Sequence, residues 1–331
     1  MTSFAIHRLR HVVFLGAAPN IEEIVGALVD LDIEYSLITS PSQASSFPEE
    51  YSVRVFEKLD NSFISFIKSN YCIEETLFVS LAARWIFKSE IFADLMNNQL
   101  VNFHGTRLPL DSGGGGFSWR IMRGDRIDNQ LVHLIDSGVD TGDIIYTKTS
   151  IFPKHCITPR GIEEYHRAQF TKFFHEFCMK VKDGHSFKLM PQQSYLGSYM
   201  PRLSTLNNGY IDWSLNSDQL IRFIDAFDDH YPGALTLLNG TLVHLKNVQR
   251  HGGEITGHPF MRGLVIRNEK DWIVIRTSDE FCLIVENVHT SDGVNIVSKV
   301  RVGDRLFTPP EMLNSSLGYR AKFGPKTREI Y

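Results

Sequence analysis

The chain has 331 residues, of which 43% are hydrophobic and 22% charged, so it can bury a sizeable core, and its length suits two domains better than one. Its formal net charge of -4 gives no general attraction to polyanions such as nucleic acids. The four cysteines are scattered without paired spacing, which argues against a disulfide framework and a zinc knuckle and favours a reducing, cytoplasmic location.

The first half of the chain alternates short apolar runs with amphipathic ones. HVVFLG at 11–16 predicts a buried strand, because its surroundings lack the length of a membrane span and the layout of a signal peptide. A helix is expected from about Asn20, a capping residue with Glu23 three positions later. We expect further strands at EYSLITS, SVRVFEKL, TLFVSLA and LVNFHGT, and helices at FISFIKSN and around 89–97. This alternation predicts an α/β fold with a Rossmann-like, mostly parallel sheet and helices on both faces.

The second half has a different pattern. A long helix is expected to begin at Thr158-Pro159 and to end before Gly184. The segment 191–208 is rich in Ser, Pro, Gly and Asn, which is typical of a linker. Beyond a short helix at about 217–227, Asn239-Gly240 predicts a tight hairpin among several antiparallel strands. We therefore predict a domain over 1–204 and a smaller, β-rich, barrel-like domain over 205–331.

Three polar residues are candidates for a catalytic site. Asn102 and His104 lie two positions apart at the end of a predicted strand, so their side chains point the same way, at the edge where parallel sheets bind ligands. Asp140 lies in the glycine-flanked loop SGVDTG, which can return a carboxylate to the imidazole. The amide can donate to an oxyanion, the imidazole can carry a proton, and the carboxylate can orient the imidazole. From spacing alone, local backbone hydrogen bonding is the commoner role of such residues.

Two other patterns predict no site. The glycine run at 113–116 lacks the Lys and Ser/Thr of a phosphate-binding loop. The residues His155, Cys156, His166 and His175 match no ligand spacing, so we expect no metal.

The segments NFHGTRLPLDSGGGGFSW and GDRIDNQLVHLIDSGVDTGDII resemble the folate-dependent formyltransferases, whose signature is Asn-x-His, Leu-Pro, a glycine-rich turn, a Trp and a later Asp-x-Gly. The resemblance implies N10-formyltetrahydrofolate as co-substrate and places the family's catalytic residues on Asn102, His104 and Asp140. SLAARWIF and the loop opposite it resemble the family segments around the pterin ring, which implies Trp85, Ile86, Phe87, Asp136, Ser137, Gly138 and Val139. The later segment from SYMPRLSTLNNGYIDW to HYPGALT resembles the family's junction between its two domains.

The chain departs from this family in one turn. The usual Ser-Leu-Leu-Pro is Thr106-Arg107-Leu108-Pro109 here, the usual Arg-Gly is Ser112-Gly113, and a usual Pro is Gly116. Because that turn faces the acceptor in the family, the departures bear on the acceptor and leave the three catalytic positions intact.

Two branches of the family differ in the acceptor amine: one acts on initiator methionyl-tRNA and the other on nucleotide-linked amino sugars. A tRNA enzyme needs positive charge to meet phosphates. Residues 205–331 carry 14 Lys and Arg against 15 Asp and Glu, a net of 14 − 15 = −1, and SPSQASSFPEE, where the tRNA branch carries a basic insertion, has no basic residue. We therefore expect the amino-sugar branch, with methionyl-tRNA formyltransferase as the alternative.

For a nucleotide-linked sugar, Tyr199 and Arg202 are candidate contacts, because the guanidinium fork suits a pyrophosphate. A surface tyrosine and an interdomain ion pair explain the two residues equally well. The family branch also implies a homodimer. The remaining alternative is a non-catalytic protein that binds folate or a nucleotide sugar.

Overall fold

The computed structural model describes residues 2–17, 20–114 and 116–321. These residues divide into two compact units, and each unit draws on several stretches of the chain. The first unit comprises Met1–Ser112, Ile127–Ile151 and His166–Tyr199, and the second comprises Gly113–Arg126, Phe152–Tyr165 and Met200–Tyr331. The domain boundary expected between 204 and 205 remains a prediction.

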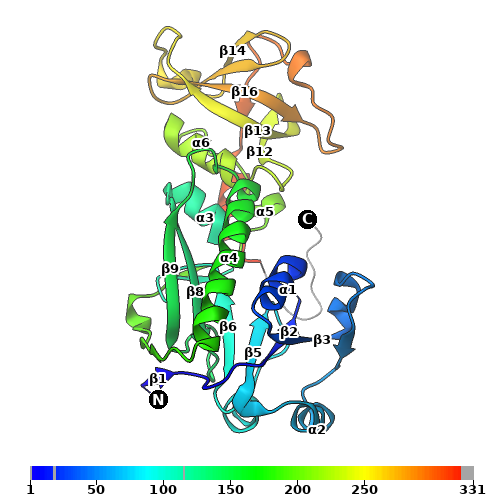
Figure 1. The fold of residues 1–331 in the computed structure, drawn as a ribbon. Coiled ribbons are helices and arrows are strands. Elements are labelled where there is room, and N and C mark those ends of the chain that lie inside the picture. Colours follow the sequence, from blue (N-terminus) through cyan, green and yellow to red (C-terminus); the bar gives the residue numbers. More distant parts are fainter. Residues whose placement is uncertain (1, 18–19, 115, 322–331) are drawn as a thin grey trace. The chain divides into compact units, whose positions relative to one another are not determined.

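Among its described residues, the first unit contains a seven-stranded sheet (Figure 1). Strands β2, β3, β4, β5 and β6 run parallel to one another. Strand β8 is antiparallel to β6, and β9 is antiparallel to β8. In the order of the sheet, the strands are β4 (Val53–Val55), β3 (Glu34–Thr39), β2 (His11–Gly16), β5 (Thr76–Leu81), β6 (Leu100–His104), β8 (Ile127–Leu134) and β9 (Ile144–Ile151). The mostly parallel sheet predicted from the sequence is confirmed.

Helices cover both faces of this sheet because its central strands are apolar on both sides. Val12 and Phe14 of β2 belong to one hydrophobic cluster, and Val13 and Leu15 belong to another. The first cluster includes side chains of α1 (Ile21–Asp30) and α4 (Pro159–Lys182). The second includes α2 (Asn61–Asn70), which Asp60 caps, and a π-helical turn (Glu90–Leu95). The sequence therefore predicted both layers correctly, although the expected helix at 89–97 is this π-helical turn.

Shorter elements lie outside the two large sheets. Strand β1 (Ser3–Phe4) pairs with β10 (Phe187–Lys188), and β7 (Asp111–Gly113) pairs with β11 (Ser198–Met200). Single turns of 3₁₀-helix lie at Pro41–Ser46, Ile73–Glu75 and Ser194–Leu196.

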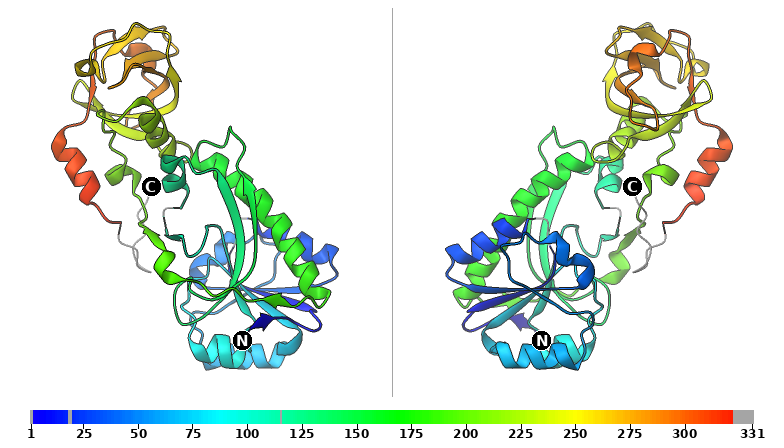
Figure 2. Two further views of the ribbon diagram at one scale, coloured as in Figure 1. Left: turned by 90° about the vertical axis from the view of Figure 1, so that its left-hand side faces the viewer. Right: turned by 90° about the vertical axis from the view of Figure 1, so that its right-hand side faces the viewer.

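The second unit contains a curled antiparallel sheet of six strands among its described residues (Figure 2). Its hairpin turns at Asn239-Gly240, where both residues have positive φ as a type I′ turn requires. In sheet order the strands are β14 (Val265–Asn268), β15 (Ile273–Arg276), β16 (Cys282–His289), β13 (Thr241–His251), β12 (Ala234–Leu238) and β17 (Leu306–Phe307). The helices are α3 (Gly116–Arg123), α5 (Thr205–Asn208), α6 (Ser217–Ala226) and α7 (Pro310–Gly318), with 3₁₀ turns at Pro259–Met261 and Val297–Lys299. The predicted β-rich, barrel-like part is confirmed.

The cysteines and the helix lengths can be examined across both units. All four cysteines lie within the described part of the chain and are free thiols, as their spacing predicted. Over the same residues, we find no helix with both the length and the apolar character that a membrane span requires.

Helix α6 carries a buried acid that makes the stability of the second unit depend on pH. Burial, together with the nearby Asp228 carboxylate, raises the pKa of Asp225 to about 8. The folded state therefore holds a proton that the unfolded chain loses near pH 4, so the free energy of unfolding falls as pH rises from about 4 to 8.

We expect Asp225→Asn to remove much of this pH dependence, because the amide stays neutral. Each pKa unit corresponds to about 1.4 kcal/mol, so the loss of stability between pH 5 and pH 8 should shrink by an amount on the order of a few kcal/mol. Urea unfolding at the two pH values measures this difference. Asp218→Asn is the matched control, since Asp218 is an exposed acid of the same helix. Equal pH dependence in wild type and Asp225→Asn would show that Asp225 ionises normally.

Candidate active site

Strand β6 presents two of the three candidate side chains. The carboxyl ends of β2, β5 and β6 lie at one edge of the sheet because these strands are parallel. Asn102 and His104 alternate with the packed Phe103 and so project from the same face of β6. Asn102 pairs with His133 across the antiparallel neighbour β8. The edge predicted to bind ligands therefore carries the predicted polar residues.

Asp140 returns to these residues on the loop after β8. Its Oδ1 lies 3.4 Å from Asn102 Nδ2 and 3.8 Å from His104 Nδ1. Asp140 itself has φ +56, a left-handed conformation that Asp tolerates better than most residues. A Cβ at Gly142 would lie 1.8 Å from the carbonyl oxygen of Leu134, so only glycine fits there. The structure thus brings Asn102, His104 and Asp140 together.

The Asp140 loop is held from within and from outside. Within it, Asp136 Oδ1 accepts hydrogen bonds from the Gly138 amide at 3.0 Å and from Thr141 Oγ1 at 2.6 Å. From outside, Gln192 Nε2 donates to the carbonyl oxygens of Asp140 at 3.0 Å and Gly142 at 2.7 Å. The Gln192 side chain therefore fixes the backbone at two points of the turn that carries the Asp140 carboxylate. Sequence reasoning missed Gln192, because it lies 52 residues from Asp140 in a stretch that reads as a linker.

His133 is a fourth member of the cluster, although its place in the sequence did not reveal it. Its side chain is 2% exposed, and burial lowers its pKa below the ordinary value, which favours the neutral ring. The ring Nδ1 lies 2.8 Å from the carbonyl oxygen of Leu134, which can only accept, so the ring proton sits on Nδ1. His133 Nε2 then accepts from Asn102 Nδ2 at 3.1 Å. His133 therefore determines which way the Asn102 amide faces.

These side chains also form a cluster of metal-ligand type: ligand atoms of His104, His133 and Asp140 lie within 4.8 Å of one another. However, Asn102 Nδ2 faces both His133 Nε2 and Asp140 Oδ1 at hydrogen-bonding distance and engages lone pairs that a cation would need. We therefore interpret the cluster as a site that handles protons. The expectation that the chain uses no metal remains a prediction.

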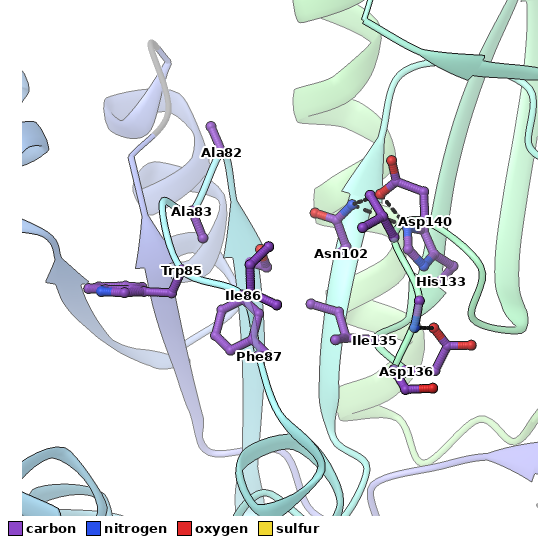
Figure 3. Close-up of a pocket in the computed structure, with 14 residues that line it drawn as sticks. Ala82, Ala83, Trp85, Ile86, Phe87, Asn102, His133, Ile135, Asp136 and Asp140 are labelled. Carbon is purple, nitrogen blue, oxygen red and sulfur yellow. Dashed lines mark hydrogen bonds and ion pairs between the residues drawn. The ribbon is translucent and has the colours of Figure 1, made fainter. Parts of the chain in front are cut away.

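A cavity of about 270 Å³ lies beside this cluster (Figure 3). Its two walls are the loop after β5 and the loop after β8, and Asn102, His133 and Asp140 lie at one end of the second wall, whereas His104 is not among the lining residues. All seven residues expected to contact the pterin line it: Trp85, Ile86, Phe87, Asp136, Ser137, Gly138 and Val139. Additional lining residues are Ser80, Ala82, Ala83 and Ile135.

The lining is suited to a flat, partly apolar ligand. Phe87 is buried beneath the cavity, whereas Ile86 and Val139 are 81% and 77% exposed. The Trp85 ring points away from the opposite wall, and its Nε1 donates to the carbonyl oxygen of Glu57 at 3.4 Å. Exposed apolar side chains at the mouth of a cavity are typical of ligand contacts. The residue roles expected from the resemblance remain predictions.

The two expected acceptor contacts do not line this cavity. Tyr199 belongs to the first unit and is 74% exposed on β11. Arg202 belongs to the second unit, where its Nε lies 3.5 Å from the carbonyl oxygen of Gly114. Gly115, in the middle of the glycine run, lies outside the described residues.

We expect Gln192→Ala to lower kcat about tenfold to a hundredfold, because a catalytic group displaced by about 1 Å can lose that much. The substitution frees the carbonyls of Asp140 and Gly142 while leaving the carboxylate in place. Initial-rate kinetics of the reaction that the family resemblance implies measure the loss. Gln193→Ala is the matched control, since the neighbouring glutamine is exposed and its side chain accepts from Tyr195 Oη. Equal rates in the two variants would exclude a positioning role for Gln192.

Several known proteins are similar to this chain in sequence or in fold. Residues 204–298 match the family model "Formyl transferase, C-terminal domain". A methionyl-tRNA formyltransferase of Blochmanniella pennsylvanica is 26% identical over 233 residues, which are 69% of this chain and 68% of that protein.

Two solved structures share the fold. One is the N-formyltransferase from Helicobacter canadensis in complex with folinic acid and dTDP-3-aminofucose, with a TM-score of 0.60, 16% identity and coverage of 84% of this chain and 99% of that one. The other is WlaRD, a sugar 3N-formyl transferase, with a TM-score of 0.59, 17% identity and coverage of 85% and 98%. The matched domain, the fold and the curated relatives are thus all similar to those of the formyltransferase family.

Proposed function

We propose that this protein is an N-formyltransferase that moves a formyl group from N10-formyltetrahydrofolate to the primary amine of a nucleotide-linked amino sugar. The observation that carries the proposal is the convergence of Asn102, His104 and Asp140 at the end of the cavity lined by the expected folate residues. A donor held in that cavity would present its formyl group beside the three polar side chains.

The roles follow from the functional groups. The amine attacks the formyl carbon, a carbon–nitrogen bond forms, and the bond to N10 breaks. Asn102 and His104 donate toward the formyl oxygen as negative charge builds on it. In the structure the Asn102 amide nitrogen faces His133 at 3.1 Å and Asp140 at 3.4 Å, so the longer contact is the one that we expect the formyl oxygen to displace. Asp140 holds the His104 ring, and this pair passes the proton that the amine loses toward N10.

Charge supports an amino-sugar acceptor. The part of the chain from 205 to 331 is nearly neutral, and the stretch 40–50 has no basic residue and two Glu. In the structure this stretch forms a 3₁₀ turn in which Gln43 Nε2 donates to the carbonyl oxygen of Ala82, on the loop that lines the cavity. A tRNA acceptor would require a positive surface for its phosphates. The two solved sugar N-formyltransferases share this fold over almost their full lengths, which agrees with the proposal.

Methionyl-tRNA is the second candidate acceptor, because a curated sequence relative is a methionyl-tRNA formyltransferase. The decisive experiment supplies N10-formyltetrahydrofolate with dTDP-, UDP- or GDP-linked amino sugars, or with initiator methionyl-tRNA, and follows the formation of tetrahydrofolate. Turnover with a sugar nucleotide supports the proposal, and turnover with tRNA alone, inhibited strongly by salt, identifies the other branch. Folate binding without turnover of any amine would indicate a non-catalytic binding protein. We also propose a cytoplasmic location and a homodimer, to be tested by fractionation and light scattering.

A further inference from the structure

Thr106 lies between the candidate catalytic histidine and a fixed backbone carbonyl. It follows β6 by two residues, and its side chain is buried. Its Oγ1 lies 2.8 Å from His104 Nε2 and 2.7 Å from the carbonyl oxygen of Asp111. Both distances lie in the normal range for hydrogen bonds, so the hydroxyl engages both groups at once.

A hydroxyl has a single hydrogen, and this restricts the proton positions. The Asp111 carbonyl oxygen can only accept, so the Thr106 hydrogen points to it. The Thr106 oxygen must then accept from the other neighbour, which places a hydrogen on His104 Nε2. The opposite assignment would set two lone pairs against each other at 2.7 Å.

The acceptor carbonyl is held in place by contacts with Arg107, one of the positions at which this chain departs from the family signature. Arg107 Nε lies 3.1 Å from Asp111 Oδ2, and the Asp111 amide donates to the Arg107 carbonyl oxygen at 2.7 Å. Asp111 is 5% exposed, so water competes little for its contacts. The Arg107–Asp111 pair closes the turn and keeps the Asp111 carbonyl oriented toward Thr106.

If Nε2 keeps its hydrogen, Nδ1 is the ring nitrogen that can gain and lose a proton. His104 Nδ1 faces Asp140 Oδ1 at 3.8 Å. Titratable or charged groups near the ring include His133 of β8, with ring centroids 6.2 Å apart, and the Arg107–Asp111 pair, whose Asp111 carbonyl accepts from Thr106. We propose that Thr106 is a positioning residue that keeps the permanent proton of His104 on Nε2, so that Nδ1, the nitrogen facing Asp140, gains and loses the proton during formyl transfer. The catalytic part of this inference rests on the proposed function, in which the proton that the amine loses ends on N10 and the ring is regenerated.

The first test is a ¹⁵N NMR experiment on the imidazole rings, with neither folate nor acceptor present. The His104 signal is assigned from its loss in a His104→Ala spectrum. In wild type we expect the neutral ring to carry its hydrogen on Nε2. Thr106→Ser keeps the hydroxyl and should keep this tautomer, whereas the isosteric Thr106→Val should shift the ring toward the Nδ1–H form. A wild-type ring protonated on Nδ1 would overturn the proposal, whatever the variants do.

The second test compares pH profiles. In Thr106→Val the protonated ring loses the acceptor of its Nε2–H, whereas the neutral ring can move its hydrogen to Nδ1. The charged form is therefore destabilised more, and the NMR titration midpoint of the ring should fall by up to about one pH unit. We expect kcat to fall about tenfold with little change in KM for folate, and Thr106→Ser to restore kcat. An unchanged tautomer and midpoint in Thr106→Val would contradict the proposal. Because the NMR result needs no turnover, it fails or holds independently of the proposed function.

Discussion

Replacing His104 with alanine is expected to lower kcat for formyl transfer by about two to three orders of magnitude, because one side chain supplies both proton transfer and a donor to the formyl oxygen. His104 lies 3.8 Å from Asp140 and 2.8 Å from Thr106, so its loss also removes the partner that the carboxylate orients. Binding of folate should change little, since His104 does not line the cavity. Steady-state kinetics together with a folate titration separate the two effects.

The matched control is His11→Ala. His11 lies at the amino-terminal end of β2, at the opposite edge of the same sheet, and its side chain is 20% exposed against 18% for His104. Both substitutions therefore remove a similarly buried ring, and circular dichroism should show both variants folded. If His11→Ala loses as much activity as His104→Ala, the loss comes from a disturbed sheet structure and not from a catalytic role of His104.

The layers of the fold could be predicted from the sequence because they follow from local patterns. Val12 to Leu15 are apolar on both sides of a strand, and α1 and α2 have apolar faces of helical period, so a sheet covered on two faces was predictable. The antiparallel pairing of β8 and β9 was not predictable, since a strand's direction depends on how its connection crosses the sheet. Nor does local pattern reveal that residues 113–126 and 152–165 pack with the second unit.

The candidate site also combines residues that local sequence pattern reveals with residues that it does not. Asn102 and His104 were identifiable from strand alternation, and Asp140 from its flanking glycines and the family signature. His133 reads as one more residue of an apolar strand, and its role depends on the register that sets it opposite Asn102. Gln192 acts through its side-chain amide on a loop 52 residues earlier in the chain. Residues that position a catalytic group across such distances in the sequence become visible only when the backbone is folded.

Replacing Asp140 with asparagine is expected to lower kcat by about two to four orders of magnitude. The substitution preserves shape while removing charge: Asn tolerates φ +56 as well as Asp does, and the bonds from Gln192 reach backbone carbonyls, which the variant keeps. What is lost is the negative charge beside His104 Nδ1, which favours the protonated form of the ring.

Two comparisons isolate this charge. Asp143→Asn removes a carboxylate three residues later in the same segment. It should leave kcat within about twofold, as expected for a substitution that removes no specific structural interaction. In Asp140→Asn, the limb of the pH–rate profile that reports ring protonation should move to lower pH, because the ring loses its anionic neighbour. If Asp140→Asn keeps wild-type turnover and an unshifted profile, the carboxylate only shapes the loop. Gln192→Ala should then impair turnover more than Asp140→Asn, since it alone would disturb the backbone of the turn.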